Sequence, residues 1–236
     1  MTVVTKVFAL ILALLAGFFA HAEATVSMTV TLIEIDETGY LAQQDDGQPV
    51  RILFNNNTRF DLPFEAAVGD RVEVTYDGRM TRSLPPQITA QRVAAADALL
   101  GAVREADAPA RRVLVATAAL GAVWVTLPEG ADAEALLGKG VRVYTNGAVA
   151  LSLPAQATAL SVAEAPLQTG VITDVAEGAF LLETAQGMLR VVLADGVSQE
   201  GLSVGQQVQV LTGSAMALSE PPQVGGLAVL DWSEGE

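Results

Sequence analysis

The chain contains no cysteine, a single histidine and few aromatic residues. Without cysteine it can form no disulfide, thiol nucleophile or thiolate-ligated metal site. The single histidine, His21, directly follows an apolar N-terminal run, so the chain beyond it lacks the imidazole of a Ser-His-Asp triad or of a histidine-ligated metal. Aromatic residues, the usual platforms for sugars, make up 5% of the chain. These absences predict a protein that has no metal or cofactor and is not an enzyme.

Basic residues are also scarce. Thirteen lysines and arginines stand against 27 acidic residues, and the formal net charge is −14. Such a surface repels phosphate backbones and anionic lipid headgroups. We therefore expect no nucleic-acid partner, and we interpret the acidity as a source of solubility.

The N-terminus has the pattern of a secretory signal peptide, predicted to cover residues 1–24. Lys6 provides the positive start, Val7–Ala20 is an unbroken apolar run, and two small-x-small sites follow at 20–22 and 22–24. The alternative is a membrane anchor, but the run has 14 residues and a spanning helix needs about 20. No cysteine follows the run, so no lipid anchor is expected there. We predict export to the periplasm or the medium, with no membrane span in the mature chain.

Three segments repeat one pattern at fixed spacing. A glycine precedes an alternating Val-x-Val stretch, and a Ser-x-Pro-x-Gln element follows; the glycine-to-serine distance is 14 residues and the serine-to-glutamine distance is 4 residues in each copy. The copies are separated by 69 and then 67 residues. Such coincidences indicate tandem domains. We predict repeats at 25–96, 97–165 and 166–236.

Each repeat is predicted to contain three strands, a short helix and two more strands. Runs rich in Val, Ile, Leu and aromatics give the first three strands: 29–35, 40–43 and 50–54; 99–104, 113–117 and 122–127; 170–175, 179–184 and 189–193. The short helix is clearest at 131–137, before Gly138. The fourth strand alternates, as in 72–76, and Asp77-Gly78 and Asn146-Gly147 then indicate hairpin-type turns.

This order predicts an all-β protein with short helices, built from three five-stranded OB-like barrels. An SH3-like or other small barrel is the alternative. A unit of about 60 residues is marginal alone, because it buries only about 60% of its unfolded surface. The joints at 94–97 and 163–166 are short, so we expect neighbouring units to pack end to end as a fairly rigid rod.

The most distinctive residues form the Ser-x-Pro-x-Gln elements: Ser83, Pro85 and Gln87; Ser152, Pro154 and Gln156; Ser219, Pro221 and Gln223. With the preceding strand they resemble a family of small secreted bacterial domains of uncharacterised function that carry V-x-V-x-Y-x-G followed by S-x-P-A-Q. The first copy matches the front half and the second copy matches the back half. The third lacks the tyrosine and has its turn glycine at Gly213. The resemblance implies a fold and no activity.

We interpret the element as structural, with a ligand contact or serine nucleophile as the alternative. Proline fixes φ and favours extended geometry in the residue before it. Serine can bond the loop backbone, and glutamine can satisfy a buried peptide group. The element would then define where the fifth strand begins.

The leading functional hypothesis is an exported, non-enzymatic binding or scaffold protein of the cell envelope whose partner is an envelope protein or a small ligand. Ligands of OB-type barrels lie across strands two and three. The first repeat holds six arginines, so it is the best candidate for an anionic ligand. The candidate residues are Tyr40, Arg51, Phe54, Arg79 and Arg82. Pairing of these arginines with nearby acids is the alternative.

Two other functions stay open. Paired carboxylates among Asp45, Asp46, Glu65 and Asp70 could form a hydrolase acting on envelope carbohydrate, and the first two could contribute to a calcium site, although no D-x-D-x-D-G loop is present. A purely structural spacer would have equivalent surfaces on all three repeats and no concave polar pocket.

Overall fold

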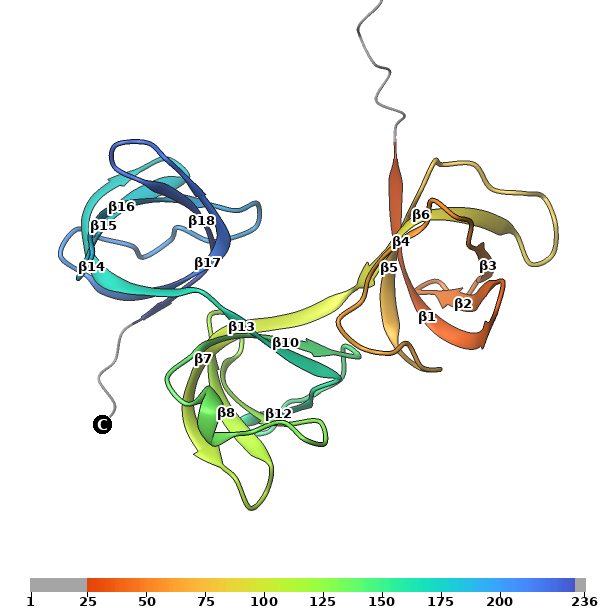
Figure 1. Ribbon diagram of the computed structural model, residues 1–236, viewed down its shortest axis with the longest axis horizontal. Coiled ribbons are helices and arrows are strands. Elements are labelled where there is room, and N and C mark those ends of the chain that lie inside the picture. The colour runs from red at the N-terminus through yellow and green to blue at the C-terminus, as the bar shows by residue number, and fades with distance from the viewer. Residues whose placement is uncertain (1–24, 232–236) are drawn as a thin grey trace, which may run out of the picture.

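The computed structural model describes residues 25–231. The predicted signal peptide at 1–24 lies outside this range, as do residues 232–236. The described chain is all β, as predicted: its strands form three sheets that follow one another along the sequence (Figure 1). None of the helical structure between residues 25 and 231 has the length and apolar character that crossing a membrane requires.

The third sheet is a closed five-stranded barrel with the order β14-β15-β16-β18-β17. Its strands are β14 (Leu167–Ala176), β15 (Ala179–Thr184), β16 (Gly187–Leu193), β17 (Gln207–Ala217) and β18 (Gln223–Asp231). Neighbouring strands are antiparallel except β16 and β18, which run parallel and join the third strand of the unit to the fifth.

The first sheet has the same cycle of pairings. Its strands are β1 (Val26–Asp36), β2 (Gly39–Gln44), β3 (Pro49–Leu53), β4 (Arg59–Asp61), β5 (Arg71–Tyr76) and β6 (Gln87–Ala95). β1 pairs with β2 and β5, β2 with β3, and β5 with β6. The parallel pair β3–β6 completes the ring, and the additional β4 continues along the same edge of β6.

In the second sheet the last strand is divided in two. The strands are β7 (Asp97–Asp107), β8 (Arg112–Thr117), β9 (Gly121–Thr126), β10 (Gly140–Thr145), β11 (Val149–Ala150), β12 (Ala155–Thr158) and β13 (Ser161–Ala165). β12 pairs with β9 and β13 pairs with β10. Between them, the amide of Ala159 donates to the Thr126 carbonyl at 2.9 Å and that of Leu160 to the Tyr144 carbonyl at 2.8 Å. The ring of pairings therefore continues across the division.

Each unit has its own apolar core, formed by the inward side of the alternating strands. In β5 the valines and the tyrosine are buried and the residues between them are half exposed, as a period of two requires. Two glycines at matching positions let the first strand bend closely over the second. A Cβ on Gly101 would lie 2.2 Å from the Ala116 carbonyl oxygen, and one on Gly170 would lie 2.3 Å from that of Glu183.

The predicted helices are largely wrong. Only the second repeat has helical structure within the described residues, a single 3₁₀ turn at Glu134–Leu136. The Asp132 carboxylate accepts hydrogen bonds from the amides of Glu134 and Ala135 at its start, and Gly138, with positive φ, follows its end. In the third repeat the corresponding segment contains three glycines with φ between 81° and 88°, at 196, 201 and 205. Left-handed residues at this spacing interrupt a helix before it completes a second turn.

The predicted hairpin-type turns begin longer loops. Gly78 and Gly147 do have positive φ, and Asp77 and Asn146 accept hydrogen bonds from amides two residues on. However, β6 begins only at Gln87, ten residues after the turn starts. The intervening Ser-x-Pro segment must first turn the chain towards β3, with which β6 pairs in parallel.

A single residue separates the sheets at each joint. β6 ends at Ala95 and β7 begins at Asp97; β13 ends at Ala165 and β14 begins at Leu167. Figure 1 shows a bent chain of units in which the first and third lie on the same side of the second, so the units do not form the rod that was expected. Pro166 at the second joint fixes φ and so constrains the direction in which the chain leaves β13.

Candidate functional site

The Ser-x-Pro-x-Gln elements lie in the loops that lead into the last strand of each unit. In all three, the serine Oγ donates to the carbonyl of the proline two residues on, at 2.8 Å for Ser83, 2.6 Å for Ser152 and 2.7 Å for Ser219. The peptide bonds before Pro85, Pro154 and Pro221 are all cis. Each loop therefore closes on itself through the same hydrogen bond.

The residue after this proline attaches the loop to the third strand of its unit. The Pro86 carbonyl accepts from the Arg51 amide at 2.8 Å, and the Pro222 carbonyl accepts from the Arg190 amide at 2.8 Å. In the second unit Ala155 itself begins the parallel pairing, opposite Val123. The element thus lies where the parallel ladder starts.

The glutamines do not satisfy buried peptide groups. Gln156 Nε2 donates to Ser152 Oγ at 3.2 Å. Within residues 25–231, no hydrogen bond joins the side chain of Gln87 or Gln223 to a peptide group. All three side chains stand on the outer side of strands whose neighbouring positions point inward, which leaves them at least partly exposed.

The same loops expose leucine side chains almost completely. Relative exposure is 97% at Leu84, 103% at Leu153 and 100% at Leu218, and the second loop carries a further leucine, Leu151, at 86%. In each unit a leucine is therefore an immediate neighbour of the bonded serine. Single exposed apolar residues are ordinary on protein surfaces. Repetition of fully exposed leucines on three equivalent, internally bonded loops is the most distinctive surface feature of the described chain.

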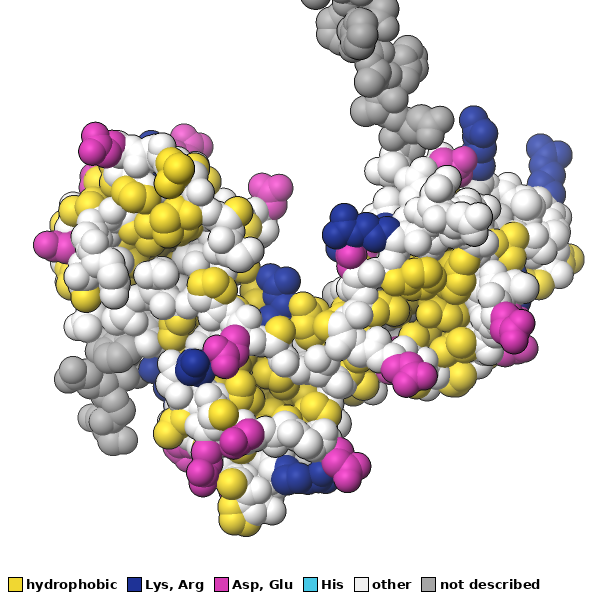
Figure 2. Space-filling view, in the orientation of Figure 1, with side chains coloured by type: hydrophobic (Ala, Val, Ile, Leu, Met, Phe, Trp, Pro, Cys, Tyr) yellow, Lys and Arg dark blue, Asp and Glu magenta, His cyan; other side chains and the backbone are white. Residues whose placement is uncertain are grey.

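Figure 2 shows that hydrophobic side chains also gather in patches on the visible face of every unit, with the charged groups mostly around them. The exposed leucines could have been found from the sequence, since each adjoins a serine of the repeated element: Leu84, Leu151, Leu153 and Leu218. Sequence reasoning concentrated on the Ser, Pro and Gln positions and missed them.

The aromatic residues predicted as ligand contacts in the first unit lie in and against the core. Tyr40 is 7% exposed, and burial raises the pKa of its phenol. Its ring contacts Phe54 edge-on with centroids 4.7 Å apart, and Phe54 contacts Phe60 in the same way at 4.8 Å. Tyr40 belongs to the core of the first unit and Phe54 packs against it, whereas Phe60 is 49% exposed.

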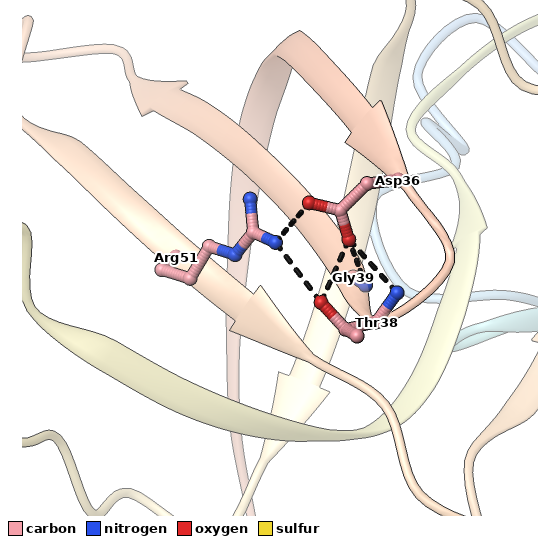
Figure 3. A network of polar contacts seen from close by, with 4 residues as sticks. All are labelled: Asp36, Thr38, Gly39 and Arg51. Atoms are coloured by element: carbon pink, nitrogen blue, oxygen red, sulfur yellow. Dashed lines mark hydrogen bonds and ion pairs between the residues drawn. The ribbon is translucent and has the colours of Figure 1, made fainter.

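Arg51 takes part in a hydrogen-bond network that fixes the turn between β1 and β2 (Figure 3). Its guanidinium forms an ion pair with Asp36 and donates to Thr38 Oγ1 at 3.1 Å. The Asp36 carboxylate also accepts from the Thr38 hydroxyl and amide and from the Gly39 amide. The Arg51 hydrogen bond, reinforced by those from Thr38, holds the pKa of Asp36 well below its usual range.

The other two candidate arginines lie in the loop before β6. Arg79 is 88% exposed in its side chain, with Asp77 at 3.7 Å, while Arg82 is exposed and has no ion pair within residues 25–231. No contact found in this range joins either residue to Tyr40, Arg51 or Phe54. The five candidates therefore do not form one site, and five of the six arginines in this unit pair with acids.

The candidate carboxylates have separate partners. Asp45 pairs with Arg71 at 3.1 Å, Asp46 accepts from the Gln48 amide, and the buried Asp70 accepts from the Ala67 amide at 2.8 Å. No group of three acidic, histidine or cysteine residues suited to a metal ion occurs between residues 25 and 231.

No known protein family matches the sequence, and no match was found among curated proteins. Similar solved structures include a multidomain protein with nucleic-acid-binding domains from Streptococcus pneumoniae TIGR4, at 12% identity and a TM-score of 0.22, covering 86% of this chain and 72% of that one. Drosophila Unr CSD456 is similar at 10% identity and a TM-score of 0.22, covering 90% of this chain and 100% of that one. Similarity at this level carries no argument about what this chain binds.

Proposed function

We propose that the protein is an exported, non-enzymatic binding or scaffold protein of the cell envelope, and that its leucine loops contact a partner protein. We define the leucine loops as residues 79–86, 148–154 and 218–222. The observation that carries the proposal is the almost complete exposure of Leu84, Leu153 and Leu218 on equivalent loops. Burial of one leucine side chain contributes about 1.5–3 kcal/mol, so three loops could supply a substantial part of a binding free energy.

The construction of the loops supports a binding role. The serine-to-proline hydrogen bond and the parallel ladder restrain each loop before any partner arrives. A restrained loop loses less conformational entropy on binding than a flexible one. Three loops on one chain can also engage a partner together, and the effective concentration of the second and third contacts is then high.

We further propose that all three units are OB-like barrels. The cycle first-second-third-fifth-fourth strand, with a parallel pair between third and fifth, is continuous in the third unit and recurs in the first and, across its divided strand, in the second. The proposal keeps the predicted repeats at 25–96, 97–165 and 166–236 and the predicted signal peptide at 1–24.

The surfaces favour binding over a pure spacer, because a spacer predicts equivalent surfaces on the three units. The first unit carries six arginines and a chain of ion pairs, whereas the third has one arginine. The hydrolase alternative gains no support from Asp45, Asp46 and Asp70, whose carboxylates bond to an arginine or to backbone amides.

Photo-crosslinking in intact cells tests the proposal. A photoreactive amino acid replaces Leu84, Leu153 or Leu218, and a control replaces Val204, which is 64% exposed on a loop outside the set. We expect a discrete crosslinked envelope protein from the leucine positions and none from the control. A second variant, with all three leucines changed to serine, should lose the complex while retaining its thermal unfolding midpoint. Crosslinks of equal yield at Val204, or a complex that survives the triple change, would contradict the proposal.

A further inference from the structure

The second unit holds the third through one defined face. The groove between them has a volume of about 960 Å³, and the second unit lines it with Ala98–Leu100 and with the hairpin at 116–122. The third unit contributes Leu227–Asp231 and residues of the loop at 196–202. We call the face on the second unit the downstream face, since it receives the next unit along the chain.

The third unit carries the same face with no further unit beside it in the described chain. A groove of about 560 Å³ is lined by Leu167–Thr169 and by the hairpin at 184–189. Strand register makes the two faces equivalent, because Gly101 pairs with Thr117 as Gly170 pairs with Thr184. Both hairpins close through the same bond: Thr117 Oγ1 donates to the Gly121 carbonyl at 3.0 Å, and Thr184 Oγ1 to the Gly187 carbonyl at 2.8 Å.

Exposure of equivalent residues shows what a covering unit does. Ala102 on β7 is 1% exposed and packs in the apolar cluster between the second and third units. Its counterpart one repeat later, Val171 on β14, is 37% exposed. Met188 and Met216, at 39% and 52% exposure, line the free groove, and Met188 lies two strands away from Val171 in the same row of the sheet. The third unit thus keeps a docking face whose counterpart is covered in the second.

The groove is uncharged in a strongly acidic unit. None of its lining residues carries a charge. Residues 167–231 contain seven acidic residues and a single base, Arg190. Glu183 stands opposite Met188 in the β15–β16 ladder, and Glu220 lies in the loop between Met216 and Pro222. The face is therefore uncharged, with leucine and methionine side chains among glutamines and threonines, and carboxylates lie near its edge.

We infer that this free downstream face docks a segment of another protein that is apolar in the middle and carries Lys or Arg at its flanks. The apolar middle of the segment follows from equivalence with the face of the second unit, against which Ala228 and Leu230 of the third unit are buried. The basic flanks follow from charge complementarity with the acidic edge. A second copy of this chain would bring two acidic units together, which like-charge repulsion disfavours. The groove shares Pro222 with the third leucine loop, but none of the exposed leucines lines it. Changes at Leu84, Leu153 and Leu218 and changes at Met188 therefore test the two proposals separately.

A phage-displayed library of random short peptides, panned against the mature chain, provides the probe. We expect the selected peptides to combine apolar residues with Lys or Arg and to compete with one another. Met188→Lys should weaken their binding by roughly tenfold or more. It places a positive charge against the apolar middle of the peptide and close to its basic flanks. Val171→Lys is the second variant. Val204→Lys, on a loop that does not line the groove, is the matched control and is expected to bind as the wild type does.

Glu183→Gln should cause a smaller loss, roughly two- to fivefold, that disappears at high salt. The inference is overturned if panning enriches no peptides, if acidic peptides are selected, or if Met188→Lys and Val171→Lys bind like the control. Sedimentation of the mature chain tests the other occupant: a dimer that Met188→Lys dissociates would show that a second copy fills the face, and would also overturn the inference.

Discussion

The two joints of the molecule are equal in length but differ in chemistry. At the joint between the first and second units, Arg71 donates to Asp97 at 3.0 Å and to Asp45 at 3.1 Å, and Gly147 lies against this cluster. At the joint between the second and third, an apolar cluster is formed by Leu100, Ala102, Ala165, Leu167, Leu211, Ala228 and Leu230. One joint is held by charges in partial contact with water, the other by buried apolar area.

Matching positions explain the difference. Leu211 and Ala228 pair across β17 and β18 at the apolar joint. Their counterparts in the second unit are Tyr144 and Ser161, which pair across β10 and β13 and both carry hydroxyl groups. A few outward side chains therefore decide whether neighbouring units pack through apolar area or through charged groups.

The largest effect is expected at the apolar joint. Leu211→Ala removes a fully buried side chain and should lower the free energy of unfolding by about 2–5 kcal/mol. Because Leu211 belongs to the interface cluster, the second and third units should then unfold as separate transitions in a denaturant titration. A single transition shifted by under about 0.5 kcal/mol would show that this cluster does not hold the joint.

Gly147→Ala should disturb the polar joint. A Cβ there would lie 2.9 Å from Asp97 Oδ2 and 3.0 Å from Arg71 Cδ, and φ of 81° adds strain of about 1–2 kcal/mol. Gly130→Ala is the control, since Gly130 has φ of 84° but nothing within 4 Å. We expect the Gly147 variant to be the less stable of the two by thermal unfolding. Equal thermal midpoints for the two variants would mean that Arg71 and Asp97 move aside without loss of stability.

Arg71→Gln should change the relative orientation of the first and second units more than it changes the free energy of unfolding. Partly exposed ion pairs contribute about 0–1 kcal/mol, so the unfolding free energy should fall by no more than that. The chain has no cysteine, so spin labels can be placed freely at introduced pairs such as 65 with 135 and 135 with 214. The distance distribution of the first pair should broaden in the variant, and at high salt in the wild type, while that of the second pair stays unchanged. Equal broadening of both would contradict the contrast between the joints.

The smallest expected effect is a difference in acid sensitivity among the units. Hydrogen bonds from arginine lower the pKa of Asp36 and Asp61 in the first unit and of Asp107 in the second. A lowered folded-state pKa stabilises the fold above the unfolded value of about 3.9, and this stability is lost as the pH falls through the folded-state value. Hydrogen exchange measured from neutral pH down to about pH 2 should show the first unit losing protection most steeply.

Asp36→Asn should flatten this pH dependence in the first unit. No arginine–carboxylate ion pair is found among residues 167–231 of the third unit, so its protection should depend least on acid. Parallel losses in all three units would argue against the arginine–carboxylate pairs as the source.

Sequence patterns were sufficient for the strands because those patterns are local. Alternation in Arg71–Tyr76 and the apolar run of Ala179–Thr184 give the observed strands nearly residue for residue. The helix predicted at 131–137 shortened to one turn, because the start of β10 leaves little chain in which to extend it. The candidate site fared worse, since Tyr40 and Phe54 could serve a core or a ligand equally well until their neighbours were known.

The sequence alone indicated three repeats, the main strands of each and the positions of the bonded serines, since all of these follow from local period, turn residues and spacing. Only the tertiary structure decided that Arg51 binds Asp36, that the leucines beside the serines face water, and that the two joints differ in chemistry. These features depend on contacts between residues far apart in the chain. Whether an outward leucine is covered by another unit or exposed depends on where that unit packs, and no local pattern carries that information.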